Sequence, residues 1–100
     1  MSAYPVKMLY DFVDQEPTSL LAGVTASSRK FKKAVDRNRV KRLIKEAYRL
    51  QKMPLQELLI AEGKCMALFF IYIGKELPAY KEVYDKIRVL LQRLTKEIAH

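Results

Sequence analysis

The chain has 100 residues, of which half are hydrophobic, 30% are charged and only three are glycine. This is enough apolar material for one folded domain over residues 1–100, and it excludes wholesale disorder and a need for disulfides or a structural metal. The formal net charge is +8, which favours an anionic partner, and the single cysteine, which cannot form an internal disulfide, suits the cytoplasm.

The first elements in chain order are two expected strands. Residues 6–13 alternate between Val6, Met8, Tyr10 and Phe12 on one side and more polar neighbours on the other, a period of two that predicts a strand. Residues 14–19 predict a turn, and residues 20–27 predict a second strand. Because short turns usually join antiparallel neighbours, we expect these two strands to form a hairpin, with a bulge at Gly23.

A basic helix follows a polar loop over residues 28–33. From Ala34 the apolar period becomes helical, and the helix is expected to end at residues 51–53 because Pro54 disfavours helix before it. One face of this helix is apolar and comprises Val40, Leu43, Ile44, Ala47 and Leu50. The opposite face is basic and polar and comprises Asn38, Lys41, Arg42, Lys45 and Arg49, with Arg37 and Arg39 at its boundary.

The second half of the chain predicts a short helix, a strand and a long helix. Residues 55–62 follow Pro54 and precede Gly63, as a short helix does. Residues 66–73 are apolar on both faces, which predicts a central strand buried on both sides. An apolar stripe from Val83 to Ile98 predicts a helix over residues 79–98. The main order is therefore strand, strand, helix, strand, helix, an α+β two-layer sandwich.

The placement of charge is more informative than its total. Residues 29–45 contain nine basic residues and one acid, Asp36, whereas the other 83 residues have equal numbers of bases and acids. A solvated helix face usually mixes both signs, so this block predicts contact with a polyanion. Arginine grips phosphate with a planar fork, and Asn38 adds a donor and acceptor suited to a ribose hydroxyl or base edge. These features predict RNA binding.

Several other functional classes find no support in the residues. The only histidine is His100 and it is distant from Cys65, so the chain offers no Cys/His nucleophile pair, metal cluster or phosphate-binding glycine loop. The longest apolar run, residues 65–73, is too short to span a membrane, and the N-terminus does not resemble a signal peptide. No helix-turn-helix spacing is present, so DNA is not an expected partner.

Residues 33–48 carry a specific resemblance. They contain Ala-Val, then Arg-Asn-Arg, an aliphatic residue, Lys-Arg, and Lys-Glu followed by a small residue and an aromatic. This whole run closely resembles the signature helix of the bacterial ribonuclease P protein subunit, and the element order fits over nearly the whole chain. The strand residues 68–75 look like the branch of that family found in Bacteroidetes.

The resemblance implies a fold, an activity and partners. The family fold has a left-handed strand–helix–strand crossover, opposite to the general rule. In the family, the RNA subunit is the catalyst and uses bound Mg²⁺ to remove the 5′ leader from precursor tRNA, so this chain would be the protein component of an endoribonuclease and contribute no catalytic residues. Its implied partners are the ribonuclease P RNA and the precursor tRNA leader.

The resemblance also implies site residues. The expected RNA-binding residues are Arg29, Lys30, Lys33, Arg37, Asn38, Arg39, Lys41, Arg42, Lys45 and Arg49. Tyr10 would line the leader cleft, and we assign Met8 and Val35 to the same cleft. The chain begins almost at its first long strand, so we expect the basic N-terminal helix of the family to be absent. The alternative is a ribosome-associated or other structured-RNA-binding module of the same fold; a protein nuclease is disfavoured, since the residues show no carboxylate or histidine cluster.

Overall fold

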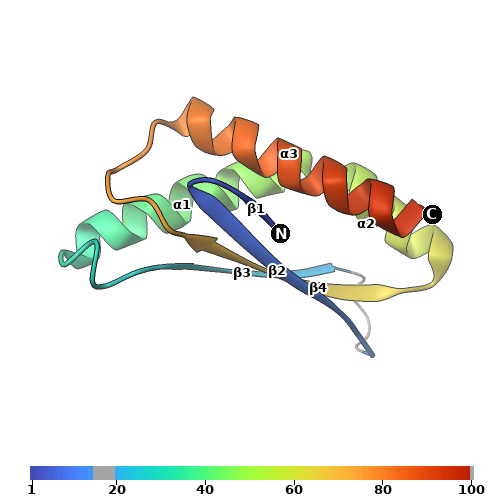
Figure 1. Ribbon diagram of the computed structural model, residues 1–100. Helices are drawn as coiled ribbons and strands as arrows, with labels where there is room; N and C mark the ends of the chain where they lie inside the picture. The colour runs from blue at the N-terminus through green and yellow to red at the C-terminus, as the bar shows by residue number, and fades with distance from the viewer. Residues whose placement is uncertain (15–19, 100) are drawn as a thin grey trace.

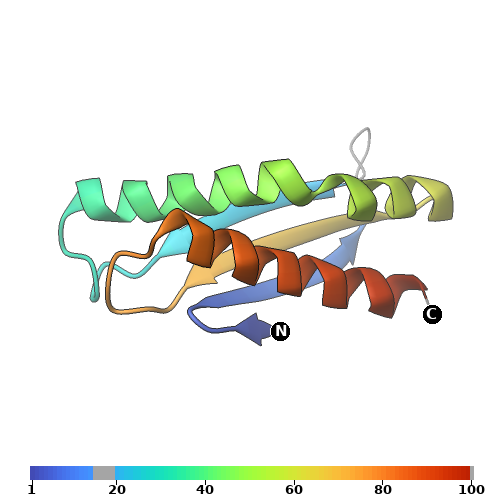
Figure 2. The same cartoon turned by 90° about the horizontal axis from the view of Figure 1, so that it is seen from above.

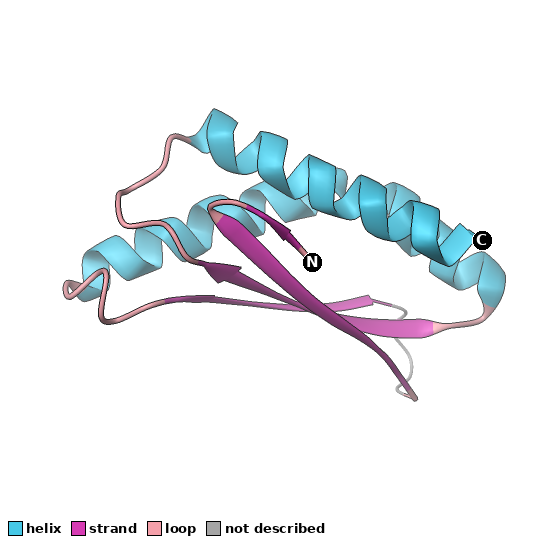
Figure 3. Cartoon of the chain, viewed as in Figure 1, coloured by secondary structure: helices cyan, strands magenta, loops and turns pink. Residues whose placement is uncertain are grey.

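The computed structural model describes residues 1–14 and 20–99 as a sheet with three helices on one of its faces (Figures 1 and 3). The elements in chain order are β1 (Ser2–Ala3), β2 (Val6–Val13), β3 (Leu20–Ala26), α1 (Ala34–Gln51), α2 (Met53–Glu62), β4 (Cys65–Tyr72) and α3 (Tyr80–Ala99). The α+β two-layer class is confirmed. The main order expected from the sequence is incomplete, because it omits β1 and α2. Most of the turn expected at residues 14–19, and His100, lie outside the described residues.

The sheet has the order β1-β2-β4-β3. The hairpin expected between residues 6–13 and residues 20–27, which correspond to β2 and β3, is therefore wrong. β4 lies between them and pairs antiparallel with β2 and parallel with β3. The physical reason is that β4 is the most apolar strand and occupies the central position, where it is bonded along both edges. Strands that are neighbours in sequence pair often but not always.

The connection from β3 through α1 and α2 to β4 is left-handed (Figure 2). Seen from the helix side with β3 and β4 pointing upward, β4 lies to the left of β3. Most parallel crossovers have the opposite hand. This arrangement sets α1 along β3 at one margin of the sheet and leaves room for α3 over β2 and β4.

The two faces of the sheet differ in burial. On the helix side, the alternate residues of β4, such as Met66 and Phe70, are buried. On the opposite side Phe69 is 41% exposed, and its neighbours Ala67 and Ile71 are partly exposed. The prediction that this strand is buried on both sides is therefore wrong, because all three helices cover the same face.

Gly23 does not form the expected bulge. The register of β3 against β4 is continuous from Leu20 to Ala26. Gly23 instead lies opposite Phe69, and a Cβ atom at this position would stand 2.9 Å from Cδ2 of the Phe69 ring. The absence of a side chain makes room for that ring.

The core lies between the sheet and the helices. From α1 it receives Val40, Ile44 and Ala47, and from α3 it receives Val83, Ile87, Leu90, Leu91 and Leu94. α1 ends at Gln51, as expected, and Pro54 stands in the first turn of α2. Gly63 ends α2 in the left-handed conformation, with φ of 66°, which glycine adopts without steric cost. Because α1 buries Val40, Ile44 and Ala47 in the core, its basic side faces solvent.

Candidate RNA-binding site

The solvent face of α1 carries the predicted basic array. Asn38, Arg39, Arg42 and Lys45 are all exposed, while Val40, Ile44 and Ala47 are buried on the other side of the helix. The division between faces that the sequence predicted is confirmed for these residues. Leu50, expected on the apolar side, is 53% exposed, and Lys41, expected on the basic side, is only partly exposed. The exposed side presents guanidinium and ammonium groups along three turns, an arrangement that suits contact with several phosphates.

Arg37 differs from its neighbours because it is only partly exposed and is engaged within the protein. Its Nη1 donates hydrogen bonds to the backbone carbonyls of Phe31, at 2.7 Å, and Lys32, at 3.0 Å. The side chain therefore fastens the loop that precedes α1. We expect Arg37 to position the basic loop as well as to add positive charge.

Arg49 is also engaged, in a different way. Its guanidinium binds Glu46 on the preceding turn, with Nε donating to Oε2 at 3.2 Å, and the pair lowers the pKa of Glu46 through this hydrogen bond. Both side chains are exposed, and an exposed pair of this kind contributes little to stability. Arg49 can therefore exchange Glu46 for a phosphate at small cost.

The loop before α1 adds four exposed bases, of which Arg29, Lys30 and Lys33 were predicted to bind RNA and Lys32 was not. Phe31 anchors this loop: it is buried and its ring centroid lies 5.8 Å from that of Tyr72. The Lys30 ammonium donates to the carbonyl of Ile73, just past β4. The loop bases are thus fixed at the N-terminal end of α1, where backbone N–H groups already favour anions.

The three predicted leader-cleft residues do not come together. Met8 is fully buried in the core and faces the helices beside Phe70, so it cannot line an open cleft and that assignment is wrong. Val35 is 76% exposed in the first turn of α1. Tyr10 lies on β2, and neither Met8 nor Val35 lines the cavity next to it.

Tyr10 does line an open cavity of about 300 Å³ at the end of α3. Its phenol donates a hydrogen bond to Oε2 of Glu97 at 2.7 Å, and this bond is the main cause of a raised pKa for Tyr10. Phe12 lies on the same side of β2, and the Lys64 ammonium is 5.3 Å from the centre of its ring. Tyr10 and Phe12 are 39% and 49% exposed, so both rings are accessible for stacking.

Phe12 and Lys64 were not among the residues predicted for a site. The signal for Phe12 was present in the sequence, because residues 10 and 12 share a side of a strand with period two. Lys64 gave no such signal, since its place beside Phe12 follows from the pairing of β2 with β4. A cation next to two accessible aromatic rings is suited to a nucleobase and its phosphate.

Metal-binding and membrane-spanning features are absent from the described part of the chain. Over residues 1–14 and 20–99, no group of three or more His, Cys, Asp and Glu side chains is arranged to hold a metal ion. Within the same ranges, none of the helices is long and apolar enough to cross a membrane. The side chains at the two surfaces described above are mainly cations and aromatics, which suit contact with nucleic acid.

Comparison with known proteins gives concordant results. A sequence model of the family described as Ribonuclease P matches residues 2–95. The chain is 32% identical over 98 residues to the ribonuclease P protein components of two strains of Porphyromonas gingivalis, ATCC 33277 and W83. Each of these alignments covers 95% of this chain and 70% of the relative. No solved structure gave a significant match.

Proposed function

The chain belongs to the ribonuclease P protein family, and on that premise we propose how it serves as the protein subunit: the basic face of α1 docks it on the catalytic RNA, and the cavity beside Tyr10 holds the 5′ leader of precursor tRNA. Family membership makes the chain part of an endoribonuclease complex that processes tRNA. A cytoplasmic location is part of the same proposal.

The docking proposal rests on one observation above all. The net charge of the whole chain is concentrated in residues 29–45, and the structure presents Arg39, Arg42 and Lys45 from that segment on one exposed helix face. Neutralising RNA phosphates with such a face releases counterions, which is the main source of affinity at moderate salt. Asn38 contributes a neutral amide within the array.

The leader proposal is supported by the chemistry of the cavity at Tyr10. A single-stranded leader exposes bases that stack on aromatic rings, and each stacked base contributes about 1–3 kcal/mol. Tyr10 and Phe12 offer two accessible rings side by side, and Lys64 is close enough to attract a leader phosphate. This assignment keeps Tyr10 in the cleft and replaces Met8 and Val35 with Phe12 and Lys64.

We assign catalysis to the RNA subunit and the binding of Mg²⁺ mainly to that RNA. We assign the side chains described at both surfaces to binding and orienting RNA. The Tyr10 phenol donates to the Glu97 carboxylate, and this bond raises the pKa of Tyr10, which disfavours the phenolate that a nucleophilic role would need. The protein therefore contributes affinity and position for the substrate. We assign no chemical step of the cleavage to residues of the protein.

The test is reconstitution with the cognate ribonuclease P RNA in Mg²⁺ at physiological salt. We expect the protein to increase cleavage of precursor tRNA and to bind precursor more tightly than leaderless tRNA. Tyr10→Ala with Phe12→Ala should reduce that difference while leaving RNA docking intact. If the protein changes neither cleavage nor leader affinity, or binds a ribosomal RNA fragment in preference, the proposal is wrong.

A further inference from the structure

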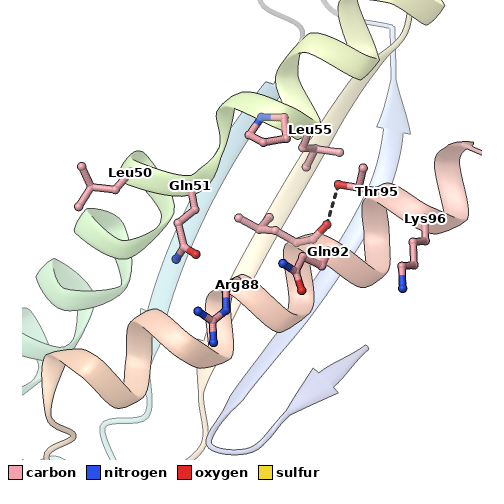
Figure 4. Close-up of a pocket in the computed structure, with 9 residues that line it drawn as sticks. Leu50, Gln51, Leu55, Arg88, Gln92, Thr95 and Lys96 are labelled. Atoms are coloured by element: carbon pink, nitrogen blue, oxygen red, sulfur yellow. Dashed lines mark hydrogen bonds between the residues drawn. The ribbon is translucent and has the colours of Figure 1, made fainter.

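A cavity of about 650 Å³ lies between the α1–α2 junction and α3, and none of the residues assigned above is among those that line it (Figure 4). We propose that it is a binding site for an unpaired nucleotide of the RNA partner, with the base inside the cavity and its phosphates on Arg88 and Lys96. This inference extends the RNA interface to α3 and rests on the proposed function. The volume of the cavity is within the range of pockets that hold small organic ligands.

The walls of the cavity are apolar. Leu50 and Leu55 come from opposite sides of the α1–α2 junction, Pro54 lies between them in sequence, and Leu91 of α3 also lines the cavity. Leu50 is 53% exposed, although it occupies the apolar side predicted for α1. A nucleobase has two apolar faces and would cover surface that is otherwise left in contact with water.

The rim of the cavity is cationic. Arg88, Gln92 and Lys96 follow one another at four-residue spacing and so form one stripe along α3, as Figure 4 shows. Arg88 and Lys96 are two helical turns apart, about 12 Å along the axis. They can therefore reach phosphates on either side of a base that enters the cavity. No carboxylate is among the described residues that line this cavity.

The polar groups in the cavity match base edges. Gln51 points from α1 across the gap toward α3, where its Nε2 donates to the carbonyl of Tyr84 at 3.0 Å and also to that of Ala47 at 3.1 Å. Its donors are thus fixed while its Oε1 faces the cavity region as an acceptor. Gln92 is exposed and offers both a donor and an acceptor. Amides of this kind bind the edges of unstacked bases.

Two observations favour RNA over an acidic peptide as the occupant. The cavity has the cations Arg88 and Lys96 at its rim and no carboxylate among the described residues that line it, which suits an anionic backbone. Arg88 makes an exposed ion pair with Asp85 at 3.4 Å, which a phosphate can replace. An amphipathic peptide would need an extended apolar groove, whereas this cavity is compact.

The experiment is an NMR titration of the full chain with each of the four ribonucleoside 5′-monophosphates. We expect shifts in the side-chain amide signals of Gln51 and Gln92 and in nearby backbone signals. Arg88→Gln with Lys96→Gln should weaken this binding about tenfold, because the single phosphate of the probe loses the one charge-assisted hydrogen bond that it makes to either side chain. The matched control is Lys75→Gln with Lys81→Gln, which removes equal charge from exposed positions outside the cavity and should leave the binding unchanged.

Three outcomes overturn the inference. The first is that nucleotides cause no signal shifts in the cavity, and the second is that the control pair weakens binding equally. The third is that a glutamate-rich peptide shifts the cavity signals whereas nucleotides do not. Circular dichroism of both double variants distinguishes weakened binding from failure to fold. Cleavage reconstitution with wild-type protein is measured separately and needs no nucleotide binding in this cavity. Failure of the cavity and failure of the proposed subunit function are therefore distinguishable.

Discussion

Tyr10 and Glu97 join the second strand to the last helix, because the phenol donates a 2.7 Å hydrogen bond to Oε2 of a carboxylate 87 residues away. The bond raises the pKa of Tyr10 above its ordinary value. It also places a negative charge beside the aromatic surface proposed for the leader. A leader phosphate that approaches this cavity therefore meets Lys64 as an attraction and Glu97 as a repulsion.

The first prediction is that Glu97→Gln increases affinity for precursor tRNA. The amide keeps a hydrogen-bond acceptor for Tyr10 but removes the charge that repels the leader. The increase should be absent with leaderless tRNA and should shrink at high salt, since the effect is electrostatic. Equilibrium binding to reconstituted holoenzyme measures it. Glu57→Gln, an equal change on the exposed side of α2, is the control, and an equal gain from that variant would contradict the prediction.

The second prediction concerns the basic face of α1. Arg39→Gln with Arg42→Gln should lower affinity for ribonuclease P RNA and reduce the slope of log affinity against log salt by about 0.9 for each RNA phosphate that is no longer neutralised. Both side chains are exposed, so folding should be unaffected. Binding is measured over a range of salt concentrations, with Lys75→Gln and Lys81→Gln as the matched pair. An unchanged slope would show that α1 is not the docking surface.

The third prediction separates Arg37 from Arg39. Arg37→Gln removes two hydrogen bonds to the carbonyls of Phe31 and Lys32, whereas Arg39 is exposed. We expect Arg37→Gln to lower the free energy of unfolding by about 1.5 kcal/mol, a typical value for hydrogen bonds from a charged group, and Arg39→Gln to leave it nearly unchanged. Urea denaturation of both variants measures the difference. Equal stabilities would mean that Arg37 does not hold the loop.

The long elements were predictable from periodicity, but the pairing of the strands was not. The apolar residues recur every two positions in residues 6–13 and every 3.6 positions in α1, and these local spacings predict a strand and a helix face. The apolar run of β4 did predict a central strand, but the identity of its two neighbours, β2 and β3, depends on contacts across the whole sheet that no local pattern specifies. The exposure of Phe69 could not be predicted from local sequence either, because it depends on which face of the sheet the three helices cover.

The candidate site was predictable to a similar degree. The charge of the α1 face placed Asn38 and Arg42 at the surface, and the family resemblance, not the period of β2, assigned Tyr10 to an accessible cleft. The same period set Met8 on the side of Tyr10, yet Met8 lies beneath the helices while Tyr10 lies at the end of α3, so only Tyr10 is accessible. The carbonyl contacts of Arg37 depend on the path of a loop, which sequence patterns do not specify.

The last prediction is a decrease of stability in alkali that depends on Tyr48. Tyr48 packs against Phe70, with ring centroids 5.5 Å apart, and burial raises the pKa of its phenol to about 12. In the unfolded chain a tyrosine titrates near a pH of about 10. Between these values the folded state binds more protons than the unfolded state, so this contribution to stability is complete below a pH of about 10 and falls as the pH rises toward about 12.

Tyr48→Phe should therefore flatten the dependence of unfolding free energy on pH in this window, by about one proton at most. Burial also raises the pKa of Tyr72 to about 12, so some of the slope should persist in the variant. Urea denaturation at a series of pH values from about 9 to about 12 measures the slope. Tyr4→Phe is the control, since Tyr4 is mostly exposed and its replacement should leave the slope as it is. If both variants give the wild-type slope, burial of Tyr48 does not couple folding to pH.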